Sequence, residues 1–148
     1  MIDVENVVIN DMTTTLRSEY LGTYPKLKIY GEYVDYPESF PCVSLWCEDN
    51  YTDPGTREID NTDEHYVRCA FRTEVIAVGD DRKAVAKDLA DRADEVYRNK
   101  GFSRLAMLMY PDTQLNAFRI TMRHSGLVQR PSVSTDGEDE SLTSLIYR

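Results

Sequence analysis

Two segments of the chain carry apolar residues at three- and four-residue spacing, the period of an amphipathic helix. Residues 3–21 form the first predicted helix, with Asp3 as its N-terminal cap. The second begins after Asp80 or Asp81, either of which can cap it, and runs to Lys100. Each helix has one polar face, so its apolar stripe is predicted to pack against another element of the fold.

The remaining apolar positions alternate with polar ones, as in strands that have one face in a core and one in water. In the longest predicted strand, residues 65–78, Phe71 and Val75 point one way and Arg68 and Arg72 the other. The other predicted strands are residues 27–30, 42–47, 104–110 and 115–128. The predicted connections are a proline-bounded turn at 37–41, an acidic loop at 48–64 and a turn at Pro111 and Asp112.

The order of these elements predicts an α+β fold. Strands 42–47 and 65–78 follow one another without a helix between them, so they should pair antiparallel. We expect a single two-layer domain, an antiparallel or mixed sheet with two helices packed on one face, over residues 1–130. Residues 131–148 are expected to form an acidic, flexible tail, in which 142–147 are candidates for an edge strand.

Charge is unevenly distributed along the 148 residues. The net charge is −9, of which residues 48–64 supply −6 and residues 131–148 supply −3, so the rest of the chain is neutral. A chain of this kind is a poor candidate for holding phosphate backbones, which requires clustered Lys and Arg. The sequence also lacks an apolar run of membrane-spanning length and a signal peptide at Met1, and we therefore expect a soluble protein made in the cytosol, with no membrane partner.

Motifs of enzyme sites are missing from the sequence: it has no glycine-rich phosphate loop, no nucleophile elbow and no metalloprotease helix. Cys42, Cys47, His65 and Cys69 have the residue types of a zinc site. Cys42 and Cys47 are an odd number of residues apart, however, and so should point to opposite faces of their strand. We expect buried core cysteines, no cofactor, no metal and no catalytic residue.

Surface residues are the better candidates for function. Trp46 should share a face of its strand with Cys42 and Ser44, while Val43 and Leu45 point to the other face. If the helices cover the face of Val43 and Leu45, Trp46 is an interface residue; if they cover the opposite face, Trp46 is a core residue. The arginines of the long strands should form cross-strand pairs with Glu74 or salt links to a neighbouring subunit. The candidate interface residues are Trp46, Asp49, Asp53, Asp60, Asp63, Arg68, Arg72, Arg119 and Arg123.

The order, lengths and turns of these elements carry a resemblance over residues 4–130. Phe40 and Pro41 lead into a strand, an acidic loop and a long strand follow, and a helix closes at Gly101 and Phe102 before the strand of residues 117–123. This pattern resembles the tail terminator, or tail-completion, proteins of long-tailed bacteriophages and the related neck and minor-capsid proteins.

The resemblance implies a subunit of a hexameric ring that caps the growing tail tube, stops its polymerisation and presents a surface to the head connector. Its partners would be other copies of the chain, the tube protein and the connector or stopper protein, with DNA passing through the lumen without specific binding. It would reside in the tail or neck of the virion, and in the host cytoplasm during assembly. The alternative is a small soluble α+β enzyme or ligand-binding domain without a recognisable motif, whose pocket the sequence cannot reveal.

Overall fold

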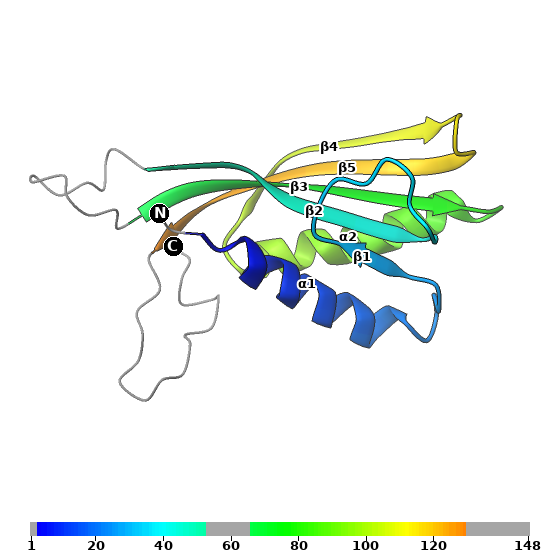
Figure 1. The fold of residues 1–148 in the computed structure, drawn as a ribbon, viewed down its shortest axis with the longest axis horizontal. Helices are drawn as coiled ribbons and strands as arrows, with labels where there is room; N and C mark the ends of the chain where they lie inside the picture. The colour runs from blue at the N-terminus through cyan, green and yellow to red at the C-terminus, as the bar shows by residue number, and fades with distance from the viewer. Residues whose placement is uncertain (1–2, 53–65, 130–148) are drawn as a thin grey trace, which may run out of the picture.

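The protein is an α+β domain in which two helices lie on one face of a five-stranded mixed sheet (Figure 1). The computed structural model describes residues 3–52 and 66–129. Its elements are α1 (Glu5–Tyr20), β1 (Lys28–Tyr30), β2 (Cys42–Thr52), β3 (Tyr66–Val78), α2 (Arg82–Asn99), β4 (Ser103–Asp112) and β5 (Ala117–Gln129). The strand order is β1-β2-β3-β5-β4, in which β1 is parallel to β2 and every other pair is antiparallel. The predicted fold class and the antiparallel pairing of β2 with β3 are confirmed.

The main core lies between the helices and the sheet. Val8, Met12 and Leu16 of α1 are buried at helical spacing, and α2 buries its own stripe against β3 and β5. The largest buried rings form one cluster, in which Phe71 meets the ring of Phe102 edge-on with centroids 5.6 Å apart. This ring lies directly against the backbone of β5.

Gly126 is the position of β5 that makes room for Phe102. A Cβ atom at Gly126 would lie 2.6 Å from the Phe102 ring, closer than carbon atoms approach one another. The absence of a side chain there therefore lets Phe102, the third residue after α2, seal the end of the core.

The structure corrects two of the predicted connections. Residues 48–52, expected to open an acidic loop, continue β2 and pair with β3 beyond a bulge at Glu48. Pro111 and Asp112, expected to turn, pair with Phe118 and Ala117 inside the β4–β5 ladder. The turn follows them instead and ends at Asn116, whose φ of 50° is one that asparagine tolerates. Both errors come from residue types that are rare inside strands.

Helix capping by aspartate is only partly as expected. The Asp3 side chain accepts a hydrogen bond from the backbone N–H of Glu5 at 3.0 Å, although Val4 is the N-cap of α1. Asp81 is the N-cap of α2, but its side chain makes no capping hydrogen bond. The predictions for the rest of the 48–64 loop and for the 131–148 tail, with its 142–147 strand, lie outside the described residues.

Candidate interaction surface

One face of the sheet is turned away from the helices and is called the outer face below. The strand register places on it the candidate interface residues that lie within the described part of the chain. Val43 and Leu45 are buried in the main core, so the helices cover their set, and Trp46 belongs to the outer face as the interface interpretation requires. Cys42 is buried there too, in a second small cluster with Ile76 and Ala117. The sheet is therefore apolar on the helix side and mixed on the other.

One end of the outer face is covered by the chain between β1 and β2. Tyr30 and Phe40 pack on the small cluster around Cys42. Tyr33, in the same segment, meets the Trp46 ring edge-on with centroids 5.8 Å apart. Tyr33 is 55% exposed and Trp46 is half-buried, so the two rings form an aromatic pair at the boundary with solvent. Sequence reasoning missed Tyr33, since nothing local shows that its loop folds back over the sheet.

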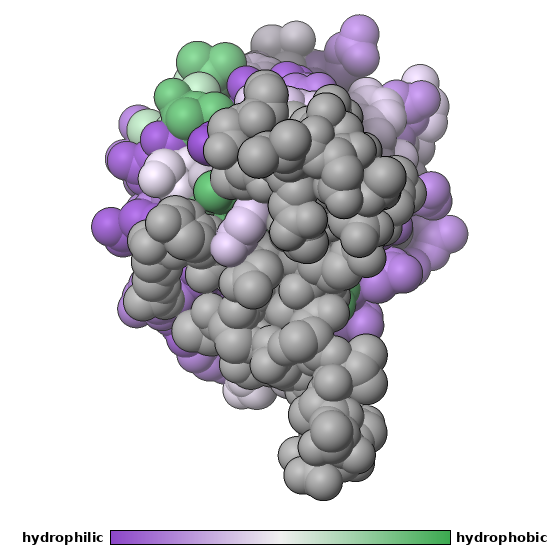
Figure 2. All heavy atoms as spheres, turned by 90° about the vertical axis from the view of Figure 1, so that its left-hand side faces the viewer, coloured by the Kyte–Doolittle hydropathy of each residue, from purple (hydrophilic) through white to green (hydrophobic). Residues whose placement is uncertain are grey.

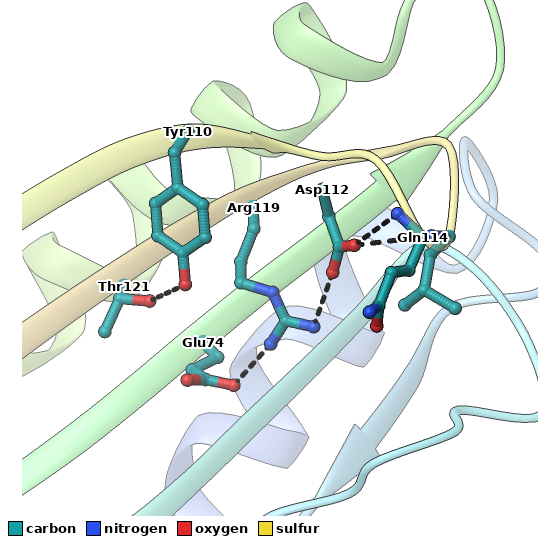
Figure 3. A network of polar contacts seen from close by, with 7 residues as sticks. Glu74, Tyr110, Asp112, Gln114, Arg119 and Thr121 are labelled. Atoms are coloured by element: carbon teal, nitrogen blue, oxygen red, sulfur yellow. Dashed lines mark hydrogen bonds and ion pairs between the residues drawn. The ribbon is translucent and has the colours of Figure 1, made fainter.

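A buried ion-pair network lies beside this covered end (Figure 3). The Arg119 guanidinium donates to Glu74 Oε2 at 2.7 Å and to Asp112 Oδ2 at 3.0 Å. Arg119 and Glu74 are 9% and 8% exposed, so each of these buried charges is compensated by the other. The hydrogen bond from Arg119 lowers the pKa of Asp112, whose second oxygen accepts the backbone N–H groups of Gln114 and Leu115. The predicted cross-strand pair with Glu74 is thus confirmed for Arg119, and it ties the β4–β5 turn to β3.

A second and more exposed ion-pair cluster joins three strands. Arg72 and Arg123 are directly opposite one another in the β3–β5 register, which on its own is repulsive. Glu48 bridges them, with one carboxylate oxygen 2.8 Å from Arg72 and the other 2.9 Å from Arg123. Asp49 adds a contact of 2.7 Å to Arg123. Because Glu48 is the bulged residue of β2, two consecutive acids reach the same arginine.

Arg68 lies on β3 four residues before Arg72, with Ala70 between the two on the same face. Its neighbours in the register are Tyr51 of β2 and Leu127 of β5. It is half-buried and has an interaction of its own. Asp53, Asp60 and Asp63 lie outside the described residues. The structure therefore brings Arg72, Arg123 and Asp49 together and places Trp46 next to them, directly opposite Arg72.

The edge strand β4 adds apolar side chains to the surface. Leu105, Leu108, Met109 and Tyr110 are 56%, 63%, 49% and 41% exposed. Hydrophobic residues accordingly gather at the upper edge of the view in Figure 2, at the height at which β4 lies in Figure 1. Leu108 and Tyr110 belong to the outer face, being opposite Thr121 and Arg119, whereas Met109 is on the helix side. Sequence alternation had indicated this strand but not its exposure.

A buried His–Asp pair is the most enzyme-like feature of the described residues. His124 Nε2 lies 2.7 Å from Asp94 Oδ1, and the His124 ring stacks on Tyr97 with centroids 4.3 Å apart. Burial lowers the pKa of His124, which is fully enclosed, against the opposing effect of Asp94. Because the His124 side chain is enclosed, its contact with Asp94 links β5 to α2 inside the core. The position of Asp94 between Ala90 and Tyr97, on the apolar stripe of its helix, was the available signal.

The three cysteines are free, and two of them meet: the Cys47 and Cys69 side chains share a hydrogen bond that lowers the pKa of Cys47. Cys42 lies in the outer cluster and Cys47 on the helix side, on opposite faces of β2 as the odd spacing of these two residues predicted. Cys69 of β3 is also on the helix side. Burial raises the pKa of the Cys42 thiol to about 12, as expected of an inert core cysteine. Within residues 3–52 and 66–129, no three His, Cys, Asp or Glu side chains are grouped so that they could hold a metal ion; His65 is outside that range. Neither described helix is long and apolar enough to span a membrane.

These features define an α+β domain with a mixed aromatic and charged surface on the open side of its sheet. No family model matches the chain, and no curated protein matches it with significance.

Proposed function

We propose that the chain is a structural virion protein that forms a ring, of six copies, at the head-proximal end of a phage tail tube. There it stops tube polymerisation and provides the surface for head–tail joining. The observation that carries the proposal is the open outer face, where the half-buried Trp46 adjoins the cluster of Arg72, Arg123, Glu48 and Asp49. Aromatic residues and arginines are enriched among residues that dominate protein interfaces.

The chemistry of this face suits a partner made of protein. Arg72, Arg119 and Arg123 are each paired with a carboxylate, so these three do not form a cluster of free positive charge for a phosphate backbone. The neutral charge of the chain outside 48–64 and 131–148 agrees with this, and acidic segments facing a lumen would keep DNA from adhering as it passes. The order and lengths of the elements support the phage assignment, because they are the features in which the chain resembles tail terminators.

The arrangement also supports a ring rather than an isolated pair. A ring requires two different surfaces on each subunit, so that contacts repeat head to tail until they close. The outer face and the helix-covered side differ in composition and charge, and the sheet has two unlike edges, the three residues of β1 and the ten of β4. Such a subunit offers unlike surfaces for each neighbour.

The test is to mix the purified chain with the tail tube protein of its phage and to follow tube length by electron microscopy. We expect tubes to stop growing once ring and tube are present, with the chain located at one tube end. Native mass spectrometry should show a closed ring, either free or released from the tube. Tubes that continue to lengthen, or a monomer that co-purifies with a small metabolite, would overturn the proposal, and the metabolite would favour a ligand-binding domain.

A further inference from the structure

Within the described part of the chain, β4 is the last strand of the sheet, and the edge that it turns away from β5 is a free edge. β4 pairs along one edge with β5, and among residues 3–52 and 66–129 no strand pairs with the other. Ten residues long and apolar over most of its length, this edge has unpaired backbone groups that readily accept another strand. Native proteins usually cover such an edge, so an occupant is expected.

A cavity on the helix side lies next to the same edge. It has a volume of about 230 Å³ and is lined by Met107 and Met109 of β4, Ile120 of β5, and Lys87, Ala90 and Asp91 of α2. A strand added to β4 would point alternate side chains towards this side of the sheet. The cavity therefore offers an apolar position for one side chain of an added strand.

From these features we infer that residues 142–147 of the same chain bind the free edge of β4 as a sixth strand, parallel to β4. Connectivity is the first reason. Ser103 at the start of β4 is opposite Ser125, so β5 leaves the sheet four residues later at the end where β4 begins. The twelve residues 130–141 can span about 40 Å when extended, whereas the new strand would lie about 10 Å from β5, two strand spacings away.

Charge complementarity is the second reason, and it fixes the direction. At the start of β4, one Asp94 carboxylate oxygen serves both Arg98 and Arg104, at 3.0 and 3.2 Å, and these arginine side chains remain 62% and 44% exposed. Two guanidinium groups sharing one buried carboxylate leave positive charge at this end. In the parallel arrangement the Glu-Asp-Glu run at 138–140 arrives at this end just before the strand begins.

The side-chain pattern of the segment is the third reason. Leu142 and Ile146 fall on one face of a strand, and Leu145 and Tyr147 on the other. In either register, one apolar pair faces the cavity and the other continues the outer row of exposed β4 side chains. The inference does not depend on the phage assignment, since it concerns the isolated chain.

The test measures amide hydrogen exchange by NMR on the full-length chain at a concentration where native mass spectrometry shows monomer. The informative amides are the alternate N–H groups of β4 that point away from β5; those that point towards β5 report on the fold. The variant, called Leu145→Pro below, carries Leu145→Pro together with Ile146→Pro. Neighbouring residues of a strand direct their N–H groups to opposite edges, so one of the two prolines removes an N–H group that would pair with β4. Thr135→Pro is the matched control, placed in the connecting segment. A synthetic peptide of residues 138–148 is then added to the Leu145→Pro chain.

We expect the outward amides of the unmodified chain and of Thr135→Pro to exchange at least about tenfold more slowly than those of Leu145→Pro. The peptide should restore slow exchange, and the inward amides should be unchanged throughout. Equal outward exchange in the unmodified chain and Leu145→Pro would overturn the inference. So would protection that rises with protein concentration and ignores Leu145→Pro, because a second copy would then occupy the edge. Neither result bears on whether the chain stops tube growth, which is measured separately.

Discussion

Replacing Arg119 with methionine should destabilise the fold far more than the same change at Arg123, although both arginines lie on β5 and face the same side of the sheet. Arg119→Met leaves Glu74 without its ion-pair partner at a position where Glu74 is 8% exposed. Breaking a buried pair from one side typically costs about 3–5 kcal/mol, because the remaining charge is neither hydrated nor paired. Arg123 is 37% exposed, and its partners Glu48 and Asp49 reach solvent, so its loss should cost less than about 1 kcal/mol.

Equilibrium unfolding in urea measures the difference. With a slope of about 2 kcal/mol per molar urea, Arg119→Met should lower the midpoint by roughly 1.5–2.5 M, while Arg123→Met should shift it by less than about 0.5 M. The double variant Glu74→Gln, Arg119→Met removes both charges and should recover a large part of the loss. Equal midpoints for the two single variants would refute the assignment of Arg119 to the structural network and of Arg123 to the exposed one.

Two further predictions concern the aromatic pair and the buried histidine. Trp46→Ala should weaken ring or tube assembly by about 2 kcal/mol or more, while its cost in fold stability should be smaller than the loss of about 3–5 kcal/mol expected for a core aromatic residue. The control is Tyr36→Ala, at a tyrosine that is 84% exposed. Unfolding of the isolated Trp46→Ala chain at a much lower urea concentration would reject the interface role. Because burial lowers the pKa of His124, the unfolded chain takes up a proton near pH 6.5 that the folded chain does not, so stability should fall from pH 7 to pH 5. Urea midpoints at both pH values check this, with His124→Gln expected to show the flatter dependence; parallel losses would contradict it.

The long strand β3 shows why much of the fold was predictable. Its apolar and polar residues alternate because one face packs on the helices, and this alternation can be seen in the sequence itself. The same holds for the helices, whose apolar stripes match the buried Val8, Met12 and Leu16. Burial on one side of a regular element leaves a periodic signal, and such a signal needs no knowledge of the partner.

Residues 48–52 show where this reasoning fails. Acidic residues and asparagine are typical of loops, but here Glu48 is held in the sheet by Arg72 and Arg123, which come from two other strands. The pairing of His124 with Asp94, thirty residues apart, was missed for the same reason. Polar contacts between distant segments leave no period in the sequence, so the candidate surface was predictable residue by residue but not as a network.

The structure also changes which acidic residues remain available to a partner. Asp49 is one of the candidate interface residues, but its carboxylate already contacts Arg123. Residues 53–64 keep five acids and one base, a net charge of −4, and these acids include Asp53, Asp60 and Asp63. If this segment attracts a basic partner, the effect must come from these acids and not from Asp49.

The prediction is that Asp53→Asn, Asp60→Asn and Asp63→Asn together reduce attachment of the chain to its tail tube while leaving the urea midpoint unchanged. The matched control removes three charges from the other acidic segment, at Asp136, Glu138 and Asp139. Attraction between exposed charges falls off over about 8 Å at physiological salt, so attachment of the unmodified chain should weaken as salt is raised, and attachment of the first variant should respond less. Attachment is measured by sedimentation of tubes with bound chain across a salt series. Equal binding and equal salt dependence for the unmodified chain and the first variant would show that the segment is only a spacer, and a loss in the control alone would move the attracting charge to the C-terminal segment.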